Sequence, residues 1–255
     1  MEKTAVLLGT GNVATHLLPA LLNAGVGVLM VYGRSYAATA ELGQRFNIPF
    51  TTDFSGLPVD ADLYLYAVSD NALPELLSRE LAPAALHLHT AGSIGMEVFP
   101  FHKPRCGVLY PLQTFSKNKA LTFKEVPLFV EGATPQITAE LFQLASVLAH
   151  KVYEVTSPQR RQLHLAAVFA CNFVNHLYAI ADELVQSSEL PFEVLRPLIA
   201  ETASKIEHLA PREAQTGPAV RRDTSVMDKH LALLAYHPVY REIYELLSES
   251  IGKQK

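Results

Sequence analysis

The sequence has few cysteines and no long uninterrupted apolar run. Its two cysteines, Cys106 and Cys171, are far apart and form no Cys-x-x-Cys pair, which excludes a disulfide framework and favours a reducing, cytoplasmic compartment. The most apolar stretch, residues 163–180, is interrupted by two histidines and two asparagines, so we expect no membrane span. The apolar run near the start, four residues before Gly9, is too short for a signal peptide.

An excess of positive charge is also missing. The 255 residues carry 21 Lys and Arg against 25 Asp and Glu, with a net charge of -4 and no basic block. This balance argues against nucleic acid and against a polybasic membrane patch, so a small-molecule partner is expected. Hydrophobic residues make up 49% and charged residues 18%, which excludes a disordered chain.

Short β-rich runs alternate with amphipathic helical runs over the first 155 residues. This pattern predicts an α/β fold with a largely parallel, doubly wound sheet. The expected strands are residues 4–8, 26–32, 49–52, 63–68, 86–90, 107–110, 128–131 and 152–155. Helices are expected after the first strand, at 36–46, after Asp70 and at 135–149; Pro19 should kink or restart the first of them.

From Ser157 onward the β-branched alternation disappears and helical periodicity continues. We therefore expect two domains, residues 1–156 with the sheet and residues 157–255 as an all-helical domain. The helices predicted there span residues 158–187, 191–209, 225–235 and 238–250.

The turn after the first strand reads Gly-x-Gly-x-x-Ala from Gly9 to Ala14. The first glycine allows a tight turn, the second lets the backbone approach a pyrophosphate, and the small Ala14 fits where helix meets strand. The helix N-terminus then offers free N–H groups to phosphates. A Rossmann dinucleotide site is predicted, and a simple tight turn is the alternative. The expected cofactor contacts in the turn are Gly9, Thr10, Gly11, Asn12 and Val13.

The end of the second strand selects between the two nicotinamide coenzymes. NAD-binding domains place an acidic residue there for the ribose, whereas this chain has Arg34 followed by Ser35. A guanidinium and a hydroxyl can bind a 2′-phosphate, so NADP is predicted over NAD. The alternative is a solvated arginine beside a serine that caps the next helix.

The end of the fourth strand supplies further candidate contacts. Ala67, Val68 and Ser69 lie at the end of the fourth strand, where we expect backbone contacts to the coenzyme. A helix start capped by Ser69 or Asp70 is the other interpretation, and both can hold.

Polar side chains after the next two strands are expected to contact a substrate. They are Thr90, Ser93 and Gln113. His87 and His89 alternate along one strand, but metal ligation would need further ligands that the sequence does not supply, so no metal is predicted.

The long helix after residue 157 has an unusual polar stripe. At about 100° per residue, His164, Asn172 and Asn175 fall within one arc, and the stretch carries no Lys or Glu before Asp182. Such a stripe indicates a helix facing a cavity. Buried polar groups satisfied by neighbouring helix ends are the alternative.

Several of these motifs together resemble one family. They are the Gly9–Ala14 turn, Ala67–Asp70, His89–Ser93, Tyr110–Phe115, the 164–175 helix, and Thr216-Gly217-Pro218 with Arg221, Asp223 and His230. With them the chain resembles proteins that join an NADP-binding Rossmann domain to a helical domain of unknown function numbered 2520, within the 6-phosphogluconate dehydrogenase-like superfamily.

This resemblance implies hydride transfer in the cleft between the two domains, and a homodimer built through the helical domain. Hydroxyacid dehydrogenases of the superfamily place a lysine four residues before an asparagine on this helix, where this chain has Val168 before Asn172. His164 is therefore our candidate acid and base, with Asn172 and Asn175 orienting a substrate. The segment around Thr216 either binds an anion or caps and solvates the surface.

Two functional hypotheses follow. The first is an NADP(H)-dependent oxidoreductase acting on a C=O or C=N bond of a small polar metabolite. The second is a non-catalytic NADP(H)-binding sensor or scaffold.

Overall fold

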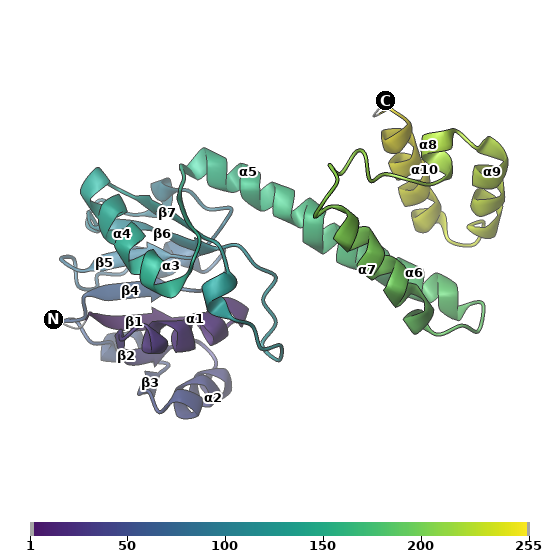
Figure 1. Cartoon of the computed structure of the whole chain (residues 1–255). Helices are drawn as coiled ribbons and strands as arrows, with labels where there is room; N and C mark the ends of the chain where they lie inside the picture. Colours follow the sequence, from purple (N-terminus) through teal and green to yellow (C-terminus); the bar gives the residue numbers. More distant parts are fainter. Residues whose placement is uncertain (1–2, 254–255) are drawn as a thin grey trace. The chain divides into compact units, whose positions relative to one another are not determined.

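The computed structural model describes residues 3–253, which cluster into two compact units divided between Asn172 and Phe173. The first unit contains a single eight-stranded sheet (Figure 1). Its strands are β1 (Thr4–Leu8), β2 (Gly27–Tyr32), β3 (Phe50–Thr51), β4 (Leu63–Tyr66), β5 (Leu86–His89), β6 (Cys106–Pro111), β7 (Leu128–Gly132) and β8 (Val152–Glu154). The predicted α/β class and all eight expected strands are confirmed.

The strand order is β3-β2-β1-β4-β5-β6-β7-β8. The first six strands in this order are parallel, and β7 then runs antiparallel to β6. After β1 the chain adds β2 and β3 on one side of that strand, and then crosses over to add β4 on its other side. The space between β1 and β4 is therefore a topological switch point. Ligands of open α/β sheets bind at the carboxyl ends of the strands beside such a point.

Helices cover both faces of this sheet. They are α1 (Asn12–Asn23), α2 (Tyr36–Phe46), α3 (Leu73–Ser78) and α4 (Pro135–Leu148). Leucines of α1 and α4 belong to one buried cluster, and leucines of α3 belong to a second cluster that contains other strand residues. The sheet is thus the middle of three layers. Helix α1 continues through Pro19, so the expected restart at that residue is wrong.

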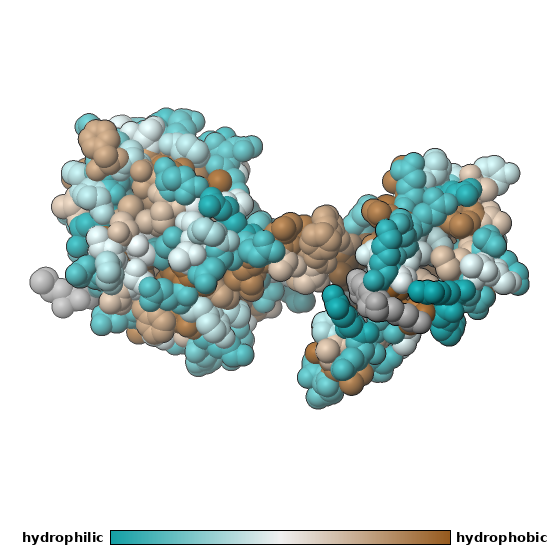
Figure 2. All heavy atoms as spheres, turned by 90° about the horizontal axis from the view of Figure 1, so that it is seen from above, coloured by the Kyte–Doolittle hydropathy of each residue, from teal (hydrophilic) through white to brown (hydrophobic). Residues whose placement is uncertain are grey.

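A continuous helical run of 30 residues follows the sheet, from Ser157 to Gln186. It consists of α5 (Ser157–Ala167), a π-helical segment (Val168–Phe173) and α6 (Val174–Gln186). Its length and composition would allow it to cross a membrane, which for a single helix is weak evidence of a membrane protein. Apolar side chains on this run are exposed (brown in Figure 2), including Leu165 and Leu177 with 49% and 37% of their surface exposed.

In the second unit, the secondary structure of the described residues is helical. It continues with α7 (Arg196–Lys205), α8 (Pro218–Arg221), α9 (Thr224–Leu233) and α10 (Pro238–Gly252). Asp223 caps α9 by accepting a hydrogen bond from the Val226 N–H at 3.2 Å, and His230 Nδ1 lies 2.9 Å from the Tyr244 hydroxyl. In the 216–230 segment the capping interpretation is therefore confirmed for Asp223.

Candidate functional site

The turn between β1 and α1 has a backbone that only glycine can adopt at its first position. Gly9 has φ +126°, and a Cβ there would lie 2.0 Å from the Ala67 carbonyl oxygen. Its N–H donates to the Tyr32 carbonyl at 2.8 Å, which ties the turn to the end of β2. Gly9 thus brings β1, β2 and the segment after β4 together at one edge of the sheet.

The next part of this turn leaves the start of α1 open. Gly11 is the N-cap, and within residues 3–253 no side chain caps the helix. A Cβ added at Gly11 would meet no described atom within 4 Å, while Ala14 is fully buried. The first N–H groups of α1 are available to an anion, and the helix dipole favours negative charge there. The turn therefore fits the phosphates of a dinucleotide.

Arg34 and Ser35 lie at the end of β2, beside this turn. Ser35 caps α2 by accepting from the Ala38 N–H at 3.5 Å, so its capping role is confirmed. Arg34 is exposed, and in the described part of the chain no acidic side chain pairs with it. A charged guanidinium beside the N-terminus of α2 fits an additional phosphate.

The segment after β4 differs from the prediction that Ser69 or Asp70 caps the next helix. Neither Ser69 nor Asp70 caps α3: the N-cap is Ala72, and the Ser69 carbonyl instead accepts hydrogen bonds from the next turn. The capping interpretation is therefore wrong, because a tight turn separates the strand from the helix. The Asp70 carboxylate is directed to Ser93 and accepts its hydroxyl hydrogen bond.

The three predicted substrate contacts already have protein partners. The buried Thr90 hydroxyl donates to the Tyr66 carbonyl at 3.5 Å, and Ser93 donates to Asp70. Gln113 is exposed and accepts from the Thr114 N–H through its side-chain oxygen at 2.8 Å. They follow neighbouring parallel strands, so all three lie at the carboxyl edge of the sheet, but Thr90 is turned into the protein.

His164 reaches the same edge from α5. Its Nδ1 lies 3.0 Å from the hydroxyl of Tyr110 near the end of β6, with the two rings edge to face. Gly92, after β5, allows this approach, because a Cβ there would lie 2.7 Å from both His164 Nδ1 and the Tyr110 ring. Burial raises the pKa of the Tyr110 phenol, so the hydroxyl keeps its proton at neutral pH.

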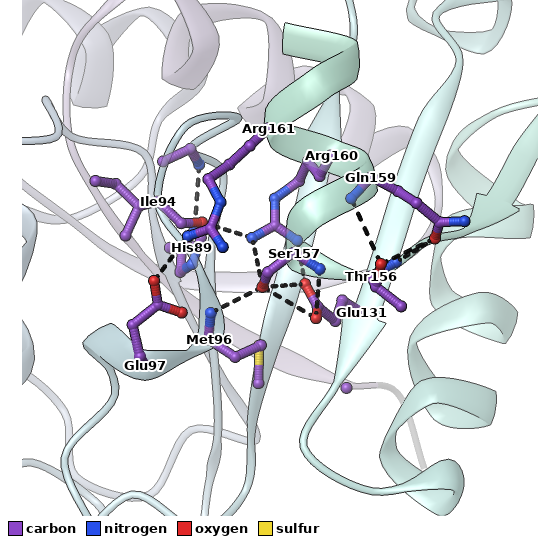
Figure 3. A network of polar contacts seen from close by, with 12 residues as sticks. His89, Ile94, Met96, Glu97, Glu131, Thr156, Ser157, Gln159, Arg160 and Arg161 are labelled. Carbon is purple, nitrogen blue, oxygen red and sulfur yellow. Dashed lines mark hydrogen bonds and ion pairs between the residues drawn. The ribbon is translucent and has the colours of Figure 1, made fainter.

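A buried ion pair fixes α5 one turn before His164. Arg160 is fully buried, pairs with Glu131 of β7 and donates to the Ile94 carbonyl at 2.5 Å (Figure 3). Ser157 donates to Glu131 at 2.8 Å and accepts from the Met96 N–H at 3.0 Å. These contacts join three elements, the start of α5, β7 and the loop after β5, and thereby set the position of His164.

The two buried histidines of β5 are structural. His87 lies 3.1 Å from both the Tyr66 hydroxyl and the Ala82 carbonyl, and His89 stacks on Phe99. Burial lowers the pKa of His87 to about 4 and that of His89 to about 3, so both rings are neutral at pH 7. Among the described residues no group of three or more His, Cys, Asp or Glu could hold a metal ion.

Asn172 and Asn175 are exposed and lie across the boundary between the two units. The π-helical segment, Val168–Phe173, separates His164 from Asn175. A π-helix turns less per residue than an α-helix, so the arc calculated from regular α-helical geometry does not hold over this stretch. Their predicted roles as substrate contacts stay predictions.

Sequence reasoning missed three residues of this site: Asp70, Tyr110 and Arg160. Tyr110 is the first residue of the Tyr110–Phe115 motif in the sequence analysis. Its position at the end of a strand could have indicated that it belongs to the site. The contact with His164 joins residues 54 positions apart, and no local pattern encodes such a pairing.

The chain was also compared with known proteins. Residues 126–251 match the family described as a domain of unknown function, DUF2520. No protein with a curated description matches the sequence.

Solved structures extend the likeness to the whole chain. A Bacteroides fragilis protein provisionally described as an NADP oxidoreductase has 45% identity and a TM-score of 0.94, with 99% of each chain covered. An imine reductase of Myxococcus stipitatus in complex with NADP⁺ has 15% identity and a TM-score of 0.71, covering 97% of this chain and 92% of its own. A 1-pyrroline-5-carboxylate reductase of Streptococcus pyogenes has 11% identity and a TM-score of 0.60, with 98% of each covered. The last two likenesses describe the fold alone.

Proposed function

This chain belongs to the family of Rossmann-like oxidoreductases that carry the DUF2520 domain, and on that premise we propose that it is an NADP(H)-dependent enzyme reducing or oxidising a C=O or C=N bond of a small polar metabolite. The observation that carries this proposal is the pairing of His164 with Tyr110 at the carboxyl edge of the same sheet whose β1–α1 turn fits a dinucleotide.

The residues proposed to hold the coenzyme come from three strand ends. Gly9, Gly11 and the first N–H groups of α1 receive the pyrophosphate, and Arg34 with Ser35 receives the 2′-phosphate. Ala67 to Ser69 line the path toward the nicotinamide end. NADPH supplies a hydride when it is bound.

His164 is proposed to exchange the proton. With its own proton on Nδ1, the ring donates to the Tyr110 oxygen, so the 3.0 Å contact persists whether or not Nε2 carries a proton. Nε2 can therefore release a proton to the oxygen or nitrogen that receives it, and take one back in the reverse reaction, while the ring keeps its orientation. Tyr110 acts as a positioning residue in this scheme.

The polar environment supports a small polar substrate. Ser93 with Asp70, and the exposed Gln113 with Thr114, present hydroxyl, carboxylate and amide groups at this edge. The free thiols of Cys106 and Cys171 support the cytoplasm as the compartment of the reaction.

The test measures NADPH oxidation across a panel of α-keto acids and cyclic imines. Wild type should turn over at least one member, and His164→Ala should lower kcat by about 10²- to 10⁴-fold, the usual contribution of a general acid or base. His150→Ala is the matched control, because His150 is 64% exposed on the surface. Tight NADPH binding without turnover on any panel member would favour a sensor or scaffold instead.

A further inference from the structure

The loop after β6 crosses the carboxyl edge of the sheet and lies on the start of α1. It leaves β6 at Pro111, and the Phe115 carbonyl accepts a hydrogen bond from Asn12 Nδ2 at 2.9 Å. Two strands, β4 and β5, stand between β6 and β1. Three strand spacings amount to about 14 Å, and four extended residues reach about 14 Å. The loop therefore has little slack as it passes the ends of β5 and β4.

A second contact fixes the loop one turn farther along α1. His16 Nε2 lies 2.9 Å from the Ser116 carbonyl and donates to it, and the His16 ring packs against Phe115 at a centroid distance of 5.3 Å. Within residues 3–253, the hydrogen bonds that join residues 113–121 to other parts of the chain come from Asn12 and His16.

Asn12 thus belongs to two sites at once. It is the first residue of α1, where the backbone N–H groups are open to phosphate, and its side chain holds the loop that carries Gln113 and Thr114. We propose that Asn12 and His16 are positioning residues that hold this loop on α1. Through them, a dinucleotide bound in the Gly9–Ala14 turn orders Gln113 and Thr114 for the small polar metabolite. This inference rests on the proposed function.

The loop contains its own reporters, Lys117 and Lys119, both exposed and both cleavable by trypsin. Removing one hydrogen bond should increase cleavage at these lysines by about 2- to 12-fold, the range that the net value of a hydrogen bond implies. Asn12→Ala removes the first donor. His16→Phe removes the second donor and keeps a ring against Phe115. The full chain is digested without coenzyme, and the cut sites are identified by mass spectrometry.

Two variants serve as controls. Asn23→Ala makes the same substitution at the exposed far end of α1 and should leave cleavage unchanged. His16→Gln restores an N–H donor without the ring and should recover much of the protection. Melting temperatures verify that each variant is folded.

Digestion in the presence of NADPH distinguishes a positioning role of Asn12 from one that only stabilises the loop. NADPH should slow cleavage at Lys117 and Lys119 in wild type, and this protection should be reduced in Asn12→Ala at saturating NADPH. Equal protection in both proteins would overturn the inference, because the coenzyme would then cover the loop directly. Equal cleavage of all variants without coenzyme would overturn it as well. A separate fluorescence titration of NADPH shows whether the coenzyme binds at all; its failure to bind wild type would overturn the proposed function and the coupling together.

Discussion

Tyr110 is the residue whose role the structure changes most. Its hydroxyl contacts His164 Nδ1, and the close approach depends on the missing side chain of Gly92. A phenol oxygen that accepts from a protonated Nδ1 can orient the imidazole whether or not Nε2 carries a proton. We therefore expect the hydroxyl of Tyr110 to matter more for catalysis than for folding.

Tyr110→Phe tests this role because it keeps the ring and removes only the hydroxyl. We expect kcat to fall by about 5- to 150-fold, since leaving a partly buried group unpaired costs about 1–3 kcal/mol. NADPH affinity should be unchanged. Tyr153→Phe is the matched control, because Tyr153 is 47% exposed on β8 and stacks on Phe129. A Tyr110→Phe enzyme with wild-type kcat would contradict the proposed orientation of His164.

Single residues also show which features of the site can be predicted from the sequence. The roles of Gly9 and Gly11 follow from a local motif, and the structure places both as expected. His164 was nominated from its position on a stretch that carries no Lys or Glu before Asp182, and its role in catalysis stays a prediction. Thr90 was nominated as a substrate contact, but its hydroxyl is buried against the Tyr66 carbonyl, because alternation along a strand end does not reveal which way a side chain turns.

At the scale of elements, strand β5 makes the stability of the protein depend on pH. His87 and His89 are buried with pKa values lowered to about 4 and about 3, whereas both titrate near 6.5 when unfolded. Below pH 6.5 the unfolded state binds protons that the folded state excludes, so stability falls as pH falls and is constant above that range.

Urea unfolding between pH 7.5 and 5.5 measures this dependence. The free energy of unfolding should fall by about 3 kcal/mol over that interval, about 1.4 kcal/mol for each histidine, because the unfolded imidazoles become protonated mainly below pH 6.5. His89→Phe keeps a ring against Phe99 and should halve the dependence, while His150→Phe should leave it intact. A profile identical in wild type and His89→Phe would show that His89 titrates normally in the folded protein.

Elements divide into those that local patterns predict and those that they do not. The eight strands and α2 were predicted closely, because hydrophobic periodicity and turn residues are local signals. The antiparallel β7 and the π-helical segment were not, because strand direction depends on long-range pairing and the extra residue in a π turn leaves no simple signature. Glu131 of β7 pairs with Arg160 at the site, and the π turn alters the arc on which Asn172 and Asn175 were predicted to lie.

At the scale of the whole molecule, the apolar surface of the 157–186 helix calls for a covering partner. Leu165 and Leu177 are exposed on it, and the chain places Asn172, Asn175 and His176 in the same stretch. In hydrocarbon these polar groups would lack hydrogen-bond partners, which favours protein over lipid as the covering surface. We propose a second copy of the chain, since one helix face can pair with itself about a two-fold axis.

Sedimentation velocity tests this assembly. Wild type should sediment as a dimer, and Leu177→Glu should shift it toward the monomer, because a buried unpaired carboxylate is costly at an interface. Phe101→Glu is the matched control, since Phe101 is 96% exposed on the sheet unit and outside the helix. A wild-type monomer at micromolar concentration, or an unaffected Leu177→Glu dimer, would contradict the proposed interface.

The central claim is that the β1–α1 turn and Arg34 together bind a phosphorylated nicotinamide dinucleotide. Isothermal titration calorimetry of the wild type and Arg34→Asp with NADPH and NADH tests it most directly. The account predicts one NADPH per chain, weaker binding of NADH, and loss of that preference in Arg34→Asp, where a carboxylate would repel the 2′-phosphate. A wild-type protein that binds neither coenzyme would contradict it.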